Sequence, residues 1–587
     1  MSFMRSKVLT IDLSKYKYEI QDRKDLFEEW VGGVGVAVQL LKEELGNDAA
    51  SVDPLGEDNV IVFATGPFTP AYPLASKTVA LFKSPLTGNL GETHAGGRTA
   101  TSIANAGYGA IVIKGVSRKP VYIVVDEDKV HFRDGRVIWG IEDSIVAGRI
   151  VAEREEGRGI RTVMRIGGGG ERLVRYACVT TETYRHFGRL GLGAVFGSKK
   201  LKALVVMGRK RYEPADKKRY REVYREIYKL AVESDVMKKY HLLGTASNVL
   251  PLNELGGLPT KNLTERRFEK ADEISGEAFA EYNLGRRIAC NHCPTACIHI
   301  AVLREPYEEE EYFFKTLMVS YDNELLYALG SMLGIGSRDG LLKLIHKVES
   351  YALDAISTGV CLAWATEALK RGIVTKDETI VELEFGNVEN YLKAIDFIVR
   401  QPNEFYRALA RGAEEAARIY GGREFAMCFG KNEMAGYHTG YAGYIGNLIG
   451  LRHSHLDAGG YSMDQKWKGY SPKEVVDALI KEEMWRQILS SLVVCFFARG
   501  LYTPEIVIKA FQPLGIETTE EELRKLGEKI YHEKLRLKRK LGFTPESLEV
   551  PKRVYELPTP LGELDEKYIS EALNYYSEVF QRITGEG

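Results

Sequence analysis

Short apolar runs separated by glycine-rich turns characterise roughly the first third of the chain. The clearest runs, at 60–63, 110–113, 121–125 and 203–206, are rich in valine and isoleucine. Runs of this length and composition between turns are typical of buried strands. We therefore expect a β-rich N-terminal domain over residues 1–210.

After about residue 210, apolar residues recur every three or four positions, which is the period of an amphipathic helix. The stretches with this pattern are 217–233, 340–350 and 405–420. We expect two mainly α-helical domains, over residues 211–420 and 421–587, and hence an α+β fold.

Residues 437–461 interrupt the helical pattern and are rich in glycine, tyrosine and histidine. A connection of this length without a secondary-structure pattern is uncommon in a compact domain unless it has a function. We expect an irregular segment that lines a binding site.

The composition of the 587-residue chain narrows the choice of partners. Its 80 basic and 81 acidic residues nearly cancel, so no overall field attracts nucleic acid or an anionic membrane. No apolar stretch approaches the roughly 18 to 20 residues of a membrane-spanning helix, and residues 1–7 lack the apolar region of a signal peptide. We expect a cytoplasmic protein that binds neither nucleic acid nor membrane.

Three of the seven cysteines, Cys290, Cys293 and Cys297, have C-x2-C-x3-C spacing and indicate a metal centre. An iron–sulfur cluster needs four thiolates and can recruit a distant one, whereas zinc can use His292 or His299. Ordinary free thiols are the third alternative. The spacing alone leaves these three interpretations open.

Two glycine-rich segments, 94–98 and 187–191, each precede a helix-like stretch and then a strand. Backbone N–H groups at the start of such a helix can hold a phosphate, and a pair of tight turns is the alternative. Neither segment fits the dinucleotide pattern G-x-G-x-x-G, so a nicotinamide cofactor is not indicated.

Four motifs in one order are now recognisable: 84–88 (SPLTG), 188–203, the cysteine motif and 353–359 (LDAISTG). Together they resemble the tungsten-containing aldehyde ferredoxin oxidoreductase family over nearly the whole chain. The resemblance implies a β domain that carries two pterin dithiolenes on one tungsten, or molybdenum, and two helical domains that close over the metal. It also implies a [4Fe-4S] cluster nearby.

The resemblance carries several roles to residues of this sequence. The cluster ligands are Cys290, Cys293, Cys297 and Cys495, the last of which by pattern alone is a buried hydrophobe. Carbonyl oxygens of His94 and Phe187 bind a bridging Mg²⁺. The implied cofactor-binding residues are Lys77, Thr93, His94, Ala95, Gly96, Arg185, His186, Phe187, Gly188, Arg189, Glu349, Leu353, Asp354, Arg452, Val494 and Cys495.

The chain departs from the family pattern at several of these positions. Lys77 stands where the family usually has arginine, which keeps the charge but loses the bidentate fork. The two D-x-x-G-L motifs have become 349–354 and 490–495, so Glu349 retains a carboxylate but Ser490 does not. We interpret the chain as a divergent member.

Some family members bridge two subunits with an iron held by an E-x-x-H motif. The corresponding residues here are Lys343 and His346, and lysine is no iron ligand at neutral pH. We expect any homodimer to lack a bridging iron.

Alignment with the family places Glu324 at the active-site glutamate, whereas by pattern alone it is a solvated surface charge. We expect burial to raise its pKa and Glu324 to act as general base. The active-site histidine aligns with His455, with His453 as the close competitor and a structural core histidine as the alternative.

The resemblance implies that an aldehyde is oxidised with water to a carboxylic acid. The electrons pass singly through the cluster to ferredoxin or to a small ferredoxin-like subunit. A first alternative is a subunit that reduces an aromatic acyl thioester, as in benzoyl-CoA reductase. A second is an electron-transfer subunit whose pterin site has decayed, as Ser490 and Val493 suggest.

Overall fold

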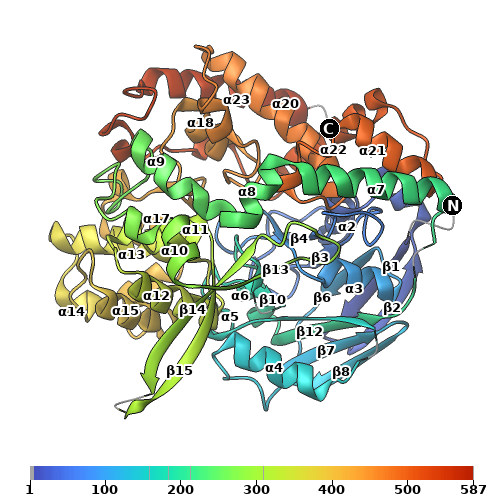
Figure 1. Cartoon of the computed structure of the whole chain (residues 1–587), viewed down its shortest axis with the longest axis horizontal. Coiled ribbons are helices and arrows are strands. Elements are labelled where there is room, and N and C mark those ends of the chain that lie inside the picture. The colour runs from blue at the N-terminus through green and yellow to red at the C-terminus, as the bar shows by residue number, and fades with distance from the viewer. Residues whose placement is uncertain (1–4, 158, 183, 212, 308–309, 586–587) are drawn as a thin grey trace.

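The computed structural model describes residues 5–585 with the exception of 158, 183, 212 and 308–309. Figure 1 shows a sheet-containing N-terminal region, blue to cyan, and helical regions that cover it from two sides. The expected α+β fold is confirmed. None of the described helices combines the length and apolarity needed to cross a membrane.

The N-terminal region consists of two six-stranded sheets with the orders β2-β1-β6-β3-β4-β5 and β11-β10-β9-β12-β7-β8. The strands of the first sheet are β1 (Lys7–Asp12), β2 (Lys17–Asp22), β3 (Ile61–Ala64), β4 (Thr78–Lys83), β5 (Leu90–Ala95) and β6 (Ala110–Lys114). Those of the second are β7 (Val121–Asp126), β8 (Lys129–Asp134), β9 (Ile160–Arg165), β10 (Val179–Thr181), β11 (Arg185–Phe187) and β12 (Leu201–Gly208).

Burial on both faces explains why these strands appear in the sequence as continuous apolar runs. In β3, Ile61 and Phe63 belong to a core shared by the two sheets. Val62 and Ala64 point the other way and pack with residues of a helix at 33–45. The helices of this region are α1 (Lys24–Trp30), α2 (Gly33–Leu45), α3 (Thr99–Ala106), α4 (Ser144–Arg154), α5 (Gly168–Glu171) and α6 (Leu192–Ser198).

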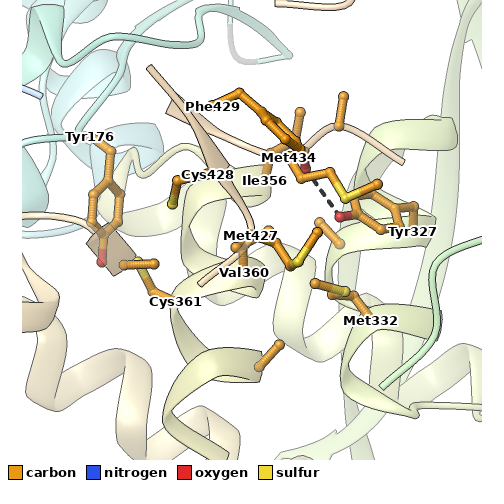
Figure 2. Close-up of a cluster of buried hydrophobic side chains, with 14 of the residues drawn as sticks. Tyr176, Tyr327, Met332, Ile356, Val360, Cys361, Met427, Cys428, Phe429 and Met434 are labelled. Carbon is orange, nitrogen blue, oxygen red and sulfur yellow. Dashed lines mark hydrogen bonds between the residues drawn. The ribbon is translucent and has the colours of Figure 1, made fainter. Parts of the chain in front are cut away.

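The rest of the chain is mainly helical, and one hydrophobic core runs through it from Ala246 to Ile583. Figure 2 shows part of this core, in which Cys361 and Cys428 lie among apolar side chains and the Tyr327 hydroxyl donates to the Met434 carbonyl. The domain boundary expected at 420–421 stays a prediction.

The helices of this part begin and end as follows: α7 (Lys217–Glu233), α8 (Asp235–Leu243), α9 (Val249–Leu255), α10 (Gly276–Tyr282), α11 (Asn323–Ala328), α12 (Arg338–Tyr351), α13 (Ala355–Lys370), α14 (Lys376–Thr379), α15 (Val388–Arg400), α16 (Glu404–Leu409), α17 (Ala413–Tyr420), α18 (Tyr441–Ile449), α19 (Gly460–Asp464), α20 (Pro472–Ser491), α21 (Pro504–Phe511), α22 (Glu520–Lys540) and α23 (Glu566–Gly585). The strands are β13 (Leu284–Ile288), β14 (Ile298–Tyr307), β15 (Glu310–Tyr321), β16 (Cys428–Phe429) and β17 (Asn432–Glu433).

Two sequence expectations need correction. The single helix expected at 405–420 is divided into α16 and α17, because Gly412 has a φ of 111° and ends the helical path. The irregular segment expected at 437–461 contains helix α18, whose first N–H groups, from Ala442 and Gly443, donate to the distant Asp464 carboxyl at 2.9 Å. A cap supplied from another part of the chain gives no local sequence signal.

Candidate active site

A cavity of about 310 Å³ lies where the sheets, the β15–α13 region and residues 452–497 meet. Most of the residues expected to hold the cofactor or to act in catalysis line it. They are Lys77, His94, Gly96, Arg185, His186, Gly188, Arg189, Glu324, Glu349, Leu353, Asp354, Arg452, His455, Val494 and Cys495.

Three expected cofactor residues lie behind this wall. The Thr93 hydroxyl accepts the Arg189 backbone N–H at 3.5 Å, and Ala95 and Phe187 are buried in the core between the sheets. None of these three residues lines the cavity.

Glu324 and His455 form a pair on the cavity wall. Glu324 lies in the first turn of α11, which Asp322 caps by accepting the Leu325 N–H at 3.2 Å. His455 Nε2 is 3.3 Å from Glu324 Oε1, and the Tyr437 hydroxyl donates to the same oxygen at 3.4 Å. Two polar groups therefore hold the carboxylate in place.

The pKa expected for Glu324 is wrong in direction. Burial would raise this pKa, but the hydrogen bond and charge of His455 and the Tyr437 hydroxyl lower it below its ordinary value. The raised pKa belongs instead to Asp322, which burial and the charge of Glu324 bring to about 7. Glu324 is therefore ionised at neutral pH, which is the form a proton acceptor needs.

His453 lies outside the cavity, although it is only two residues from His455. Its Nδ1 is 2.9 Å from the Leu448 carbonyl oxygen, and its Nε2 is 2.9 Å from Lys538 Nζ. Burial and the charge of Lys538 hold the pKa of His453 well below its usual value. Both ring nitrogens of His453 have a hydrogen-bond partner, so this residue matches the alternative of a structural core histidine.

The sheet region contributes cationic side chains to the cavity. Lys77, Arg185 and Arg189 all line it. Arg189 is anchored to the helical region through Nε, 3.0 Å from an Asp354 carboxyl oxygen, and through Nη2, 2.8 Å from the Glu433 carbonyl oxygen. This wall is suited to an anionic group such as a phosphate.

The helical region contributes the Glu349 carboxyl group, whose pKa is raised. Glu349 accepts a hydrogen bond from the Ser320 hydroxyl at 2.7 Å, and burial raises its pKa to about 8. Sequence reasoning did not identify Ser320 or Asp322 as site residues. Their signal was alternation, because residues two apart on a strand share a face, and both line the cavity at the end of β15.

The cysteine motif lies between β13 and β14, beside the cavity. A Cβ atom on Gly96 would lie 2.7 Å from Cys290 Sγ, so the motif packs directly against the sheet region. Burial, then the charges of Cys495 and Cys290, raise the pKa of Cys297 to about 12. Burial, Cys290 and Cys495 likewise raise the pKa of Cys293 to about 11. The four thiols are therefore close enough to influence one another.

The residues that the structure describes do not decide between the zinc and the iron–sulfur alternatives. Among the described residues, no three His, Cys, Asp or Glu side chains are arranged to hold one metal ion. Both ring nitrogens of His299 lie 3.1 Å from backbone carbonyl oxygens, Nδ1 from that of Cys297 and Nε2 from that of His241. A four-iron cluster spaces its thiolates more widely than a single ion does.

Comparison with known proteins decides the family. Residues 8–208 match the aldehyde ferredoxin oxidoreductase N-terminal domain, and residues 222–581 match domains 2 and 3 of the same family. The chain belongs to the aldehyde ferredoxin oxidoreductase family. The resemblance inferred from the sequence motifs is thereby confirmed.

Relatives within the family carry different activities in their names. The tungsten-containing aldehyde ferredoxin oxidoreductases of Thermococcus kodakarensis and Pyrococcus furiosus are each 33% identical, over 95% of this chain and 92% of theirs. An aliphatic sulfonate oxidoreductase, WOR-like subunit, of Pyrococcus furiosus is 30% identical over 70% of this chain and 66% of its own. This chain is thus an oxidoreductase of a diverse family.

The fold also matches a solved structure, the active-site complex BamBC of benzoyl coenzyme A reductase with 1,5-dienoyl-CoA. The TM-score is 0.81 at 21% identity, with coverage of 98% of this chain and 94% of the other. At that identity the likeness shows the shared fold.

The residues of the cavity fit the polar pterin cofactor that the family implies. Arg189 Nη1, His186 Nε2 and Glu349 Oε2 are buried and make no hydrogen bond with the described residues, and all three side chains line the cavity. Buried polar atoms in folded proteins nearly always have a partner. A polar ligand is therefore the natural partner for these atoms.

Two departures from the family pattern can be located in the structure. Ser490 is buried near the end of α20, where its carbonyl oxygen approaches Gly33, and it does not line the cavity. Lys343 on α12 is 3.1 Å from a Glu305 carboxyl oxygen on β14. Where some family members have an iron-binding glutamate, this chain thus has a lysine that forms an ion pair within the chain.

Proposed function

We propose that the protein oxidises aldehydes to carboxylic acids with water, and passes the electrons to a ferredoxin. The observation that carries the proposal is the Glu324–His455 pair, 3.3 Å apart on the cavity wall and formed by a carboxylate held ionised. The named activity of the relatives of 33% identity supports it.

The reaction RCHO + H2O → RCOO⁻ + 3H⁺ + 2e⁻ requires a proton acceptor and an electron outlet. In this proposal Glu324 takes a proton from the water that adds to the carbonyl carbon. His455 Nδ1 makes no hydrogen bond with the described residues and can polarise the carbonyl oxygen or carry the proton onward. Tyr437 orients the carboxylate through its hydroxyl.

The tungsten–pterin cofactor, when bound, supplies the two-electron oxidation. In this proposal Lys77, Arg185 and Arg189 neutralise its phosphates, and Glu349 and Asp354 accept its N–H groups. Backbone carbonyl oxygens of His94 and Phe187 would hold Mg²⁺. A cofactor with molybdenum in place of tungsten would bind to the same residues.

The thiolates of Cys290, Cys293, Cys297 and Cys495 would hold a [4Fe-4S] cluster. Such a cluster would supply one-electron transfer to ferredoxin or to a small ferredoxin-like subunit. Because Lys343 occupies the position of an iron-binding glutamate, any homodimer forms without a bridging iron.

Elemental analysis combined with turnover tests the proposal. We expect one tungsten or molybdenum, two pterins and four irons per purified chain, and aldehyde-dependent reduction of methyl viologen. Iron without pterin would support an electron-transfer subunit instead. A complete cofactor set without activity on any of a series of aliphatic and aromatic aldehydes would contradict aldehyde oxidation.

A further inference from the structure

Helix α8 covers the cysteine motif on its outer side. The Thr295 hydroxyl lies 3.5 Å from Met237 Sδ, and the Thr295 carbonyl oxygen lies 2.8 Å from His241 Nδ1. Arg287 on β13 donates to the Leu242 carbonyl at 3.2 Å. Figure 1 shows α8 at the front of the molecule, next to β13.

The motif itself reaches the surface here. Ala289 and His292, on either side of Cys290, are exposed, and Cys293 and Cys297 are half-buried. A cluster at these thiols would therefore lie just beneath this surface. The rate of single-electron transfer falls steeply with distance, so an electron carrier must come close to the surface above the cysteine motif.

The outer side of α8 has an apolar centre. Val236 is 54% and Leu242 is 56% exposed, although both side chains belong to types that usually lie inside proteins. They flank the segment of α8 that contacts Thr295. Exposed apolar side chains that are surrounded by polar ones are typical of protein-binding sites.

Two basic residues lie beside this centre. Lys238, with a side chain 58% exposed, and the exposed Lys239 both lie on α8. Asp235, an acidic residue of α8, is 3.3 Å from Lys238 and offsets part of its charge. We call Val236, Lys238, Lys239 and Leu242 the α8 patch.

We propose that the α8 patch is the docking surface for a small acidic iron–sulfur electron carrier. The inference rests on the proposed function, because it assigns a place to the exit of the electrons. Val236 and Leu242 contact the apolar surface around the carrier's own cluster, and the two lysines attract its acidic residues. Complementary charge of this kind speeds encounter more than it tightens the final complex.

Charge reversal tests the proposal on the full holoenzyme. The double variant Lys238→Glu/Lys239→Glu should lower kcat/KM for an acidic [4Fe-4S] ferredoxin by about 10-fold at low ionic strength. The difference should shrink at high salt, where exposed charges are screened. Reduction of methyl viologen, a small dication, should be unchanged. Leu242→Ala should weaken ferredoxin binding at every salt concentration.

Lys376→Glu is the matched control, since this lysine has a side chain 65% exposed and lies on α14, on the far side of the helical region in Figure 1. It should behave as the unaltered protein does. An equal loss with methyl viologen, or no change with ferredoxin, would overturn the proposal.

Calorimetric titration with ferredoxin separates this inference from the proposed function. If the unaltered protein oxidises no aldehyde, the proposed function fails, and the titration still decides the docking surface. Binding that is weakened by the double variant supports the α8 patch. Binding that is equally tight in both proteins rejects it.

Discussion

The cavity and the hydrophobic core beside it contain the same kinds of reactive side chain in opposite states. In the core, His453 uses both ring nitrogens and Cys361 lies among apolar groups with its pKa raised well above the usual value by burial. In the cavity, His455, Arg189 and Glu349 each retain a polar atom without a hydrogen bond to the described residues.

Residue type alone therefore does not identify the chemistry of a side chain. A side chain whose hydrogen-bonding groups are already used stabilises the fold, whereas one that keeps a free group facing a cavity can bind or react. Matched pairs of substitutions, one residue from each region, test this difference between the cavity and the core.

The largest difference is expected between two cysteines. Cys293→Ser should abolish the iron–sulfur cluster, because a neutral hydroxyl replaces one of four thiolates. Cys361→Ser should leave the iron content unchanged, since this thiol is buried in the core of Figure 2. Iron and sulfide analysis with electron paramagnetic resonance of the reduced protein measures both. Equal iron loss in the two variants would remove the distinction.

Two glutamates, one half-buried at the cavity and one buried in the core, form the next pair. Glu324→Gln should lower aldehyde turnover by about 10² to 10⁴-fold with metal and cluster retained, because the amide cannot accept a proton. Glu483 is buried on α20, and burial and the charge of Asp457 raise its pKa to about 8, so glutamine resembles the protonated form already present. Glu483→Gln should keep its turnover. Steady-state viologen assays compare them, and full activity in Glu324→Gln would exclude this residue as the base.

Substitutions of the two histidines should differ in effect, one lowering activity and the other lowering stability. His455→Asn should lower turnover by about 10 to 100-fold with little change in the melting temperature. His453→Asn should instead lower the melting temperature, because it leaves buried Lys538 without its ring partner. Turnover and thermal unfolding are measured on both variants. A larger loss of turnover in His453→Asn than in His455→Asn would assign the active-site role to His453, which lies outside the cavity.

The last prediction concerns stability alone and involves Asp464, a core carboxyl that caps α18. Burial raises its pKa from 3.8 to about 6, so the folded state binds this proton more tightly than the unfolded state does. Its stabilising contribution is complete below pH 4 and is lost as the pH rises to 6, by roughly 3 kcal/mol. Urea midpoints between pH 4 and 7 should show this slope, and it should be weaker in Asp464→Asn. The same slope in Asp464→Asn would show that other groups cause the pH dependence of stability.

Sequence patterns predicted the strands well, because strands buried on both faces, such as β3, leave continuous apolar runs. They failed where a distant residue decides the structure, as at α18 and its cap Asp464. The cysteine motif is local and was visible at once. The approach of Glu324 to His455 joins residues far apart in the chain, so only family resemblance could suggest it.

The cavity wall is assembled from positions between 77 and 497. During synthesis this wall cannot be complete until most of the polypeptide has emerged, so insertion of a cofactor is a late step. A ligand that joins the three regions adds its binding free energy to the stability of the folded state. Its removal should loosen the molecule first at this junction, and a protease-sensitive cofactor-free form would then mark an incompletely matured enzyme.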